Sequence, residues 1–63
     1  MKYDFLTDKE NKKINSIFNT IEKQFQKNIL TKLEADFIFF KKVNKDFQNK
    51  SFEICTNRKE FTK

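Results

Sequence analysis

The sequence predicts a mainly α-helical protein: an antiparallel two-helix hairpin with short extended termini, completed by dimerisation. Two observations predict this fold class. The segments Thr7–Glu10 and Thr31–Glu34 both have the T-x-x-E pattern of a helix capping box. The 63 residues include neither glycine nor proline, the residues that disfavour helices most strongly. A chain of this length forms one small domain, residues 1–63.

The first capping box predicts a helix over residues 8–28, preceded by an extended segment over residues 1–6. Apolar residues at spacings of three and four form a stripe about 100° wide, which suits a helix packed on one partner surface. These residues are Ile14, Ile17, Phe18, Ile21 and Phe25. The opposite side of the helix carries a row of lysines, here called the lysine ridge: Lys9, Lys12, Lys13, Lys23 and Lys27.

The second capping box predicts a helix over residues 32–48, and the short connection before it favours an antiparallel hairpin. Its apolar residues span about 160°, which is more than one neighbouring helix buries. They are Leu33, Phe37, Phe39, Phe40, Val43 and Phe47, with Ile38 off to one side and Asp36 within the arc. We expect the seam with the first helix to be filled by Leu33, Phe37, Phe40 and Phe47. That assignment leaves Ile38, Phe39 and Val43 as the predicted partner-binding residues, and we expect Asp36 to pair with Lys32 or Lys41 at the rim.

An alternative fold class is α+β, in which the N-terminal helix precedes a β-hairpin at about 37–56. The segments Phe37–Val43 and Ser51–Thr56 are rich in residues that favour strands. The absence of glycine from the connecting loop and the helix-starting residues 31–36 argue against it. Because Phe52 and Ile54 alternate with polar residues, the tail over residues 51–63 is predicted to be extended or frayed. The two termini either pair as strands or lay their apolar side chains over the helices.

The composition excludes several kinds of chemistry. The chain has one cysteine, so it cannot form an internal disulfide. Because it also has no histidine, it cannot form a zinc site of the Cys/His type or a Cys–His dyad. Without glycine there is no phosphate-binding loop. No two carboxylates have the spacing of an acid–base pair, and Cys55 fits a small, partly buried apolar residue. We therefore expect no enzymatic activity, no catalytic residues, no cofactor, no metal and no small-molecule substrate.

The formal net charge of +5 raises nucleic-acid binding as an alternative function, with the lysine ridge contacting phosphates. Two features weaken this alternative. Thirteen of the 14 basic residues are lysine, whereas base recognition favours arginine. No aromatic residue alternates with the ridge to stack on bases. The lysines also match the coding bias of an AT-rich gene, which favours Lys, Asn, Phe and Ile alike.

The expected function is that of a small protein-binding module that inhibits or regulates another protein. It would act through a Phe-rich surface on the second helix, as a homodimer, in a complex with a protein partner, or both. The profile is typical of a phage or mobile-element accessory protein, and the initial Met suggests a complete gene product. No segment is apolar enough to span a bilayer and no export-signal pattern is present, so we expect a cytoplasmic location and no membrane partner.

Overall fold

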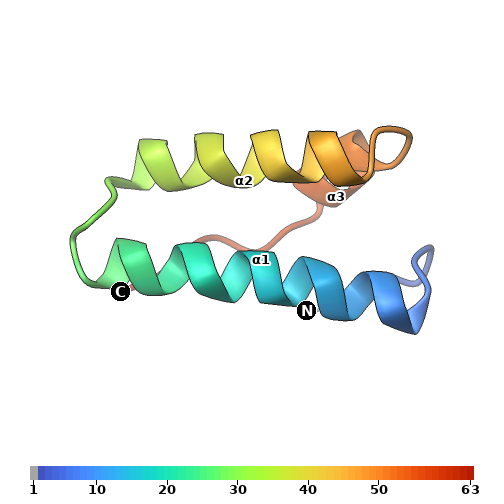
Figure 1. The fold of residues 1–63 in the computed structure, drawn as a ribbon, viewed down its shortest axis with the longest axis horizontal. Coiled ribbons are helices and arrows are strands. Elements are labelled where there is room, and N and C mark those ends of the chain that lie inside the picture. The colour runs from blue at the N-terminus through green and yellow to red at the C-terminus, as the bar shows by residue number, and fades with distance from the viewer. Residues whose placement is uncertain (1) are drawn as a thin grey trace.

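The computed structural model describes residues 2–63, which form three helices. They are α1 (Asp8–Gln26), α2 (Lys32–Asp46) and α3 (Ser51–Thr56). The long helices α1 and α2 lie side by side and run in opposite directions, and α3 follows at the C-terminal end of α2 (Figure 1). The predicted mainly helical class is thus confirmed. Because residues 2–63 contain no strand, the alternative β-hairpin at about 37–56 is wrong.

Both long helices begin with the predicted capping box. The Thr7 hydroxyl accepts a hydrogen bond from the Glu10 backbone N–H at 3.1 Å, and the Glu10 carboxylate accepts one from the Thr7 N–H at 2.9 Å. Thr31 and Glu34 make the same reciprocal pair at 3.2 and 2.9 Å. These contacts satisfy N–H groups that have no partner within the helix, which fixes where each helix starts.

The end of α1 is set by Asn28, whose φ of 62° lies in the left-handed region. Its N–H donates to the Phe25 oxygen at 3.1 Å, and the Ile29 N–H donates to the Gln24 oxygen at 2.9 Å. This pair of bonds is a Schellman motif, and asparagine tolerates the left-handed conformation better than most residues. The helix therefore ends at Gln26 rather than at the predicted residue 28. Likewise, α2 ends at Asp46 rather than at residue 48.

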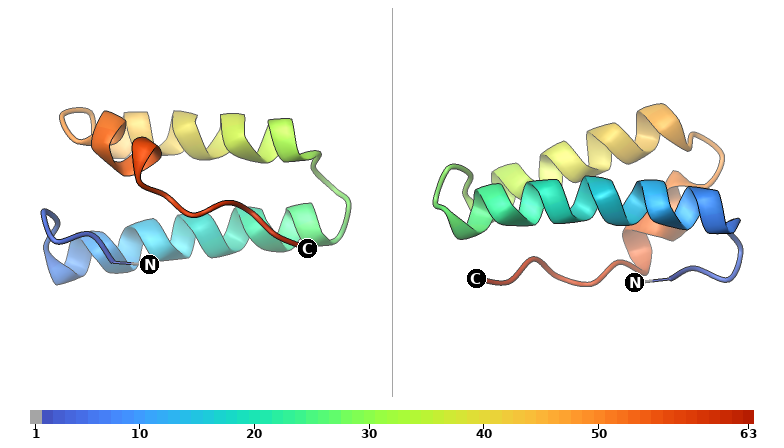
Figure 2. Two further views of the ribbon diagram at one scale, coloured as in Figure 1. Left: turned by 180° about the vertical axis from the view of Figure 1, so that it is seen from behind. Right: turned by 60° about the horizontal axis from the view of Figure 1, so that its bottom comes forward.

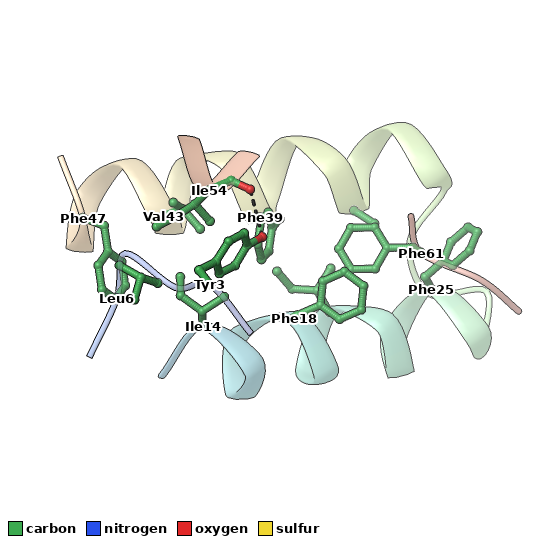
Figure 3. Packing of buried hydrophobic residues seen from close by; sticks show 12 residues of the cluster. Tyr3, Leu6, Ile14, Phe18, Phe25, Phe39, Val43, Phe47, Ile54 and Phe61 are labelled. Carbon is green, nitrogen blue, oxygen red and sulfur yellow. Dashed lines mark hydrogen bonds between the residues drawn. The ribbon is translucent and has the colours of Figure 1, made fainter. Parts of the chain in front are cut away.

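The buried core draws on all three helices and on both terminal segments (Figure 3). The α1 stripe is confirmed, since Ile17 is partly buried and its other four residues are buried. The buried apolar residues are Tyr3, Leu6, Ile14, Phe18, Ile21, Phe25, Ala35, Phe39, Val43, Phe47, Ile54 and Phe61.

The predicted inward face of α2 is largely wrong. Leu33, Phe37 and Phe40 were expected in the seam, but their exposed fractions are 80%, 59% and 49%. The buried residues of α2 are Ala35, Phe39 and Val43, and Phe47 follows them directly after the helix. These four residues are spaced by four, so they form a single ridge of the kind that packs into the groove of a neighbouring helix.

The tail over residues 51–63, predicted to be extended or frayed, is helical over residues 51–56 and has no helix or strand over residues 57–63. Residues 51–56 form α3, because a helix places Ser51 and Ile54 on its buried side and leaves Phe52 exposed. After α3 the chain runs back along the hairpin, on the same side as the N-terminal segment (Figures 1 and 2). Phe61 is 3% exposed there and stacks on Phe18, with ring centroids 4.5 Å apart. The termini therefore cover the two-helix seam with apolar side chains.

Candidate protein-interaction surface

Three large apolar side chains of α2 are exposed next to one another. Leu33, Phe37 and Phe40 are spaced by four and three residues, so they follow one another along one side of the helix. We call this set the apolar stripe. The ridge formed by Ala35, Phe39 and Val43 fills the core without them, so the apolar stripe is not needed to close the fold.

The predicted partner-binding residues lie elsewhere. Phe39 and Val43 are 0% exposed, so they belong to the chain's own core and offer no free surface. The reason is that α3 and the tail contribute Ile54 and Phe61 to the same cluster, a cover that helix periodicity alone does not reveal. Ile38 is partly buried. The spacing of Ala35, Phe39 and Val43 by four residues is the sequence signal for the buried face of α2. The prediction missed it because it left Ala35 out of the apolar residues.

The two flanks of the apolar stripe carry charged residues. On one flank, Glu34 and Lys41 are seven residues apart, about two helical turns, and the Lys41 ammonium lies 5.4 Å from the centre of the Phe37 ring. On the other flank, Asp36 binds Arg58 of the tail at 2.6 Å and Lys32 at 4.0 Å. The expected pairing of Asp36 with Lys32 is present, but the closer contact comes from the tail.

The C-terminal end of the apolar stripe is bordered by α3. Asn44, the next residue on that side of α2, accepts a hydrogen bond from the Ser51 hydroxyl at 3.1 Å. Phe52 follows Ser51 and is 79% exposed. A fourth large apolar side chain is thus exposed on the helix that borders the stripe.

A shallow groove of about 260 Å³ lies between α1 and α2. Its apolar centre includes Ile38, the one predicted partner-binding residue that retains some exposure, and its rim is polar. The lining residues are Ser16, Ile17, Thr20, Ile21, Gln24, Ile38 and Lys42. The groove is too small and too polar at its rim to rival the apolar stripe as a contact surface.

All five lysines of the lysine ridge are exposed, four of them on α1 and Lys27 directly after it. Lys13 is partly neutralised, because its ammonium lies 3.7 Å from the Asp46 carboxylate. An open polar depression of about 600 Å³ beside the ridge involves Lys2 and Lys12, but Asp8 and several Asn and Ser side chains complete it. The structure thus leaves the ridge accessible. The Phe47 ring lies 5.7 Å from the Lys13 ammonium, but it is buried and offers no face on which a base could stack.

The chemistry of the described residues gives no sign of a reactive centre. Cys55 is partly buried, and burial raises the pKa of its thiol, although the nearby Arg58 charge opposes the shift. The thiol is therefore protonated at neutral pH and is a weak nucleophile. Residues 2–63 hold no cluster of three or more His, Cys, Asp or Glu side chains that could bind a metal ion. None of the described helices is long and apolar enough to cross a membrane.

No protein-family model matches the chain, and neither do curated proteins or solved structures. The geometry of the chain's own surface is therefore the basis for assigning it a role.

Proposed function

We propose that this chain is a non-enzymatic protein-binding module that inhibits or regulates another protein through the apolar stripe. The observation that carries the proposal is the exposure of Leu33, Phe37 and Phe40 in a chain whose core is complete without them. The largest apolar patch on the surface of a soluble protein is often a site where another molecule binds.

The size of the surface supports this role. With about 200 Å² for a full aromatic side chain, the apolar stripe exposes on the order of 350 Å². This area lies within the range of about 300–600 Å² for the largest apolar patch of a typical monomer, which is often functional. Burying it would contribute up to about 9 kcal/mol before the costs of association are subtracted.

The spacing of the stripe also indicates the chemistry of the partner surface. Side chains at positions i, i+4 and i+7 of a helix suit an apolar groove or the apolar face of another helix. The partner is therefore a protein with such an apolar surface. The cytoplasmic location and the origin in a phage or mobile element stay predictions from the sequence.

A pull-down from host lysate with nuclease treatment tests the proposal at 50 and 200 mM salt. The informative variant is Phe37→Gln/Phe40→Gln, which keeps the helix and removes the apolar stripe. Phe5→Gln is the control, because it removes an exposed ring from the N-terminal segment, outside α2 and α3. We expect the wild type and the control to retain a protein partner at both salt concentrations, and the stripe variant to lose it.

Nucleic-acid binding through the lysine ridge would give a different pattern. If four or five lysines bind phosphates, affinity falls about 10²-fold or more between 50 and 200 mM salt. Recovery of nucleic acid alone, abolished by replacing Lys12, Lys23 and Lys27 with Glu, would overturn the proposal. So would a protein partner that the stripe variant retains in full.

A further inference from the structure

We propose that a second copy of this chain occupies the apolar stripe, with its α2 helix antiparallel to the first. The two stripes would face each other across a twofold axis, which is the commonest symmetry of soluble oligomers. This inference rests on the proposed function, since it names a partner for the same surface.

The spacing of the apolar stripe allows this pairing. Leu33, Phe37 and Phe40 occupy the alternating four- and three-residue positions through which helices interlock side by side. When two identical helices run in opposite directions, the order of residues is reversed across the contact. Leu33 of one copy then lies against Phe40 of the other, and the two Phe37 rings meet near the axis.

The charges beside the stripe favour the antiparallel orientation. Glu34 and Lys41 lie on the same flank, so the reversal places Glu34 of each copy next to Lys41 of the other and forms two equivalent ion pairs. A parallel pairing would instead place Glu34 near Ile29, and Lys41 near an Asp36 that already binds Arg58. Only the antiparallel arrangement gives both side chains new partners of opposite charge.

Both charged groups are available for the contact. Glu34 uses its Oε1 atom to accept from the Thr31 N–H, which leaves Oε2 for a lysine of the second copy. Lys41 lies over the Phe37 ring and makes no ion pair within residues 2–63. The net charge of +5 opposes association only weakly, because the Debye length at 0.15 M salt is about 8 Å.

The area involved sets the strength of the dimer. Two apolar stripes together supply on the order of 700 Å² of apolar surface, below the roughly 1,200–2,000 Å² of a stable interface. We therefore expect a weak dimer, with a dissociation constant of about 10–500 μM. Such a dimer dissociates readily. Self-association would therefore compete with another protein for the apolar stripe and would lower the fraction of chains in which the stripe is free.

Sedimentation equilibrium of the full chain between about 10 and 500 μM tests the inference. We expect a monomer–dimer equilibrium for the wild type. Lys41→Glu and Glu34→Lys should each weaken the homodimer about tenfold, since both attractive pairs become repulsive. The double variant Glu34→Lys/Lys41→Glu should restore it. A mixture of the two single variants should form a heterodimer, in which both pairs are attractive again.

The controls separate charge from folding. The capping box is lost equally in Glu34→Lys and in the double variant, so their difference reports the charge pair alone. Lys12→Glu makes the same change in net charge on α1 and should associate as the wild type does. Circular dichroism checks that every variant stays helical.

A wild type that is monomeric over the whole range would overturn the inference, as would single variants that associate like the wild type. If the monomeric wild type still captures a protein that Phe37→Gln/Phe40→Gln loses, the inference fails and the proposed function stands. A dimer that persists in Phe37→Gln/Phe40→Gln, with capture unchanged, would contradict both.

Discussion

The side-chain hydroxyl of Tyr3 donates a hydrogen bond to the backbone oxygen of Ile54, at 2.9 Å and across 51 residues of chain (Figure 3). That oxygen lies in the last turn of α3, where the helix itself supplies no donor. The N-terminal segment thus caps the C-terminal helix. Burial raises the pKa of Tyr3, so the hydroxyl keeps its proton and remains a donor at neutral pH.

Tyr3→Phe tests this contact. It keeps the ring in the core but leaves the Ile54 oxygen without its donor, which we expect to lower the free energy of unfolding by about 1–2 kcal/mol. Urea unfolding followed by circular dichroism measures the change. An unfolding midpoint equal to that of the wild type would show that water replaces the hydroxyl at no cost.

Phe61→Ala should be the most damaging single change in the tail. The Phe61 ring stacks on Phe18 and meets Phe39 edge-on at 6.0 Å, so its loss opens the centre of the core. Removing a buried Phe costs about 3–5 kcal/mol, which is comparable to the whole stability of a small domain. We expect loss of helical signal at 25 °C, whereas Phe61→Leu should stay folded with a lower thermal midpoint.

Phe52→Ala is the matched control for Phe61→Ala, because the Phe52 ring is largely exposed. Its effect should stay within about 0.5 kcal/mol. Equal destabilisation by the two alanine variants would mean that the tail does not close the core.

Asn11 is a buried polar residue that fixes the N-terminal segment to α1. Its Nδ2 donates to the backbone oxygens of Tyr3, Leu6 and Thr7 at 3.0, 3.3 and 3.1 Å, and its Oδ1 accepts from the Tyr3 N–H at 2.8 Å. Asn11→Ala leaves these groups without partners. We expect a loss of about 2–3 kcal/mol in thermal or urea unfolding.

The control for Asn11 is Asn19→Ala, which removes an exposed asparagine from the same helix. It should change the stability by no more than about 0.5 kcal/mol. If the two alanine variants behave alike, the N-terminal segment is held by Tyr3 and Leu6 packing alone.

Glu10 should make the stability depend on acidic pH. The hydrogen bond from the Thr7 N–H, with a smaller contribution from Lys50, lowers the pKa of Glu10 from its ordinary value of 4.5. A carboxyl whose pKa is lower in the folded state stabilises the fold above the unfolded value and loses this effect as pH falls through the folded value. Stability should therefore decline below about pH 4.5.

Glu10→Gln isolates this effect, because glutamine preserves the capping box but cannot ionise. Its urea midpoint should fall less than that of the wild type between about pH 5 and 3. Glu60, whose pKa Lys32 lowers in the same direction, accounts for part of the remaining slope. Parallel pH profiles for the wild type and Glu10→Gln would contradict the prediction.

The two long helices could be predicted from the sequence because their signals are local, whereas α3 was not predicted. The capping boxes of Thr7 and Thr31 fix where two helices start. The apolar residues of α1 span a narrow arc, so only one face of that helix can be the buried one. On α2 the apolar residues span so wide an arc that two inward faces are possible. The choice depends on α3 and the tail, which are far away in the sequence.

The predicted buried and exposed faces of α2 are exchanged in the structure for the same reason. Phe39 was assigned to the outside because four other α2 residues sufficed for the seam, yet the core also needs a partner for Phe61. Asn11 gave no signal, since an asparagine on a helix looks solvent-exposed until the segment before it folds back. What the sequence does predict correctly is an excess of apolar side chains on α2 over those that one helix can bury.

The position of Phe61 has a consequence for the order of folding during synthesis. Translation completes α1, α2 and α3 before it adds Phe61, the side chain that packs against both Phe18 and Phe39. Until residue 61 emerges from the ribosome, those two rings lack their cover and the new chain presents them to its surroundings. The hairpin can form before then, but the core closes only once residue 61 is outside the ribosome. Chaperones and proteases therefore have most access to these core residues in the interval between the synthesis of α2 and the emergence of Phe61.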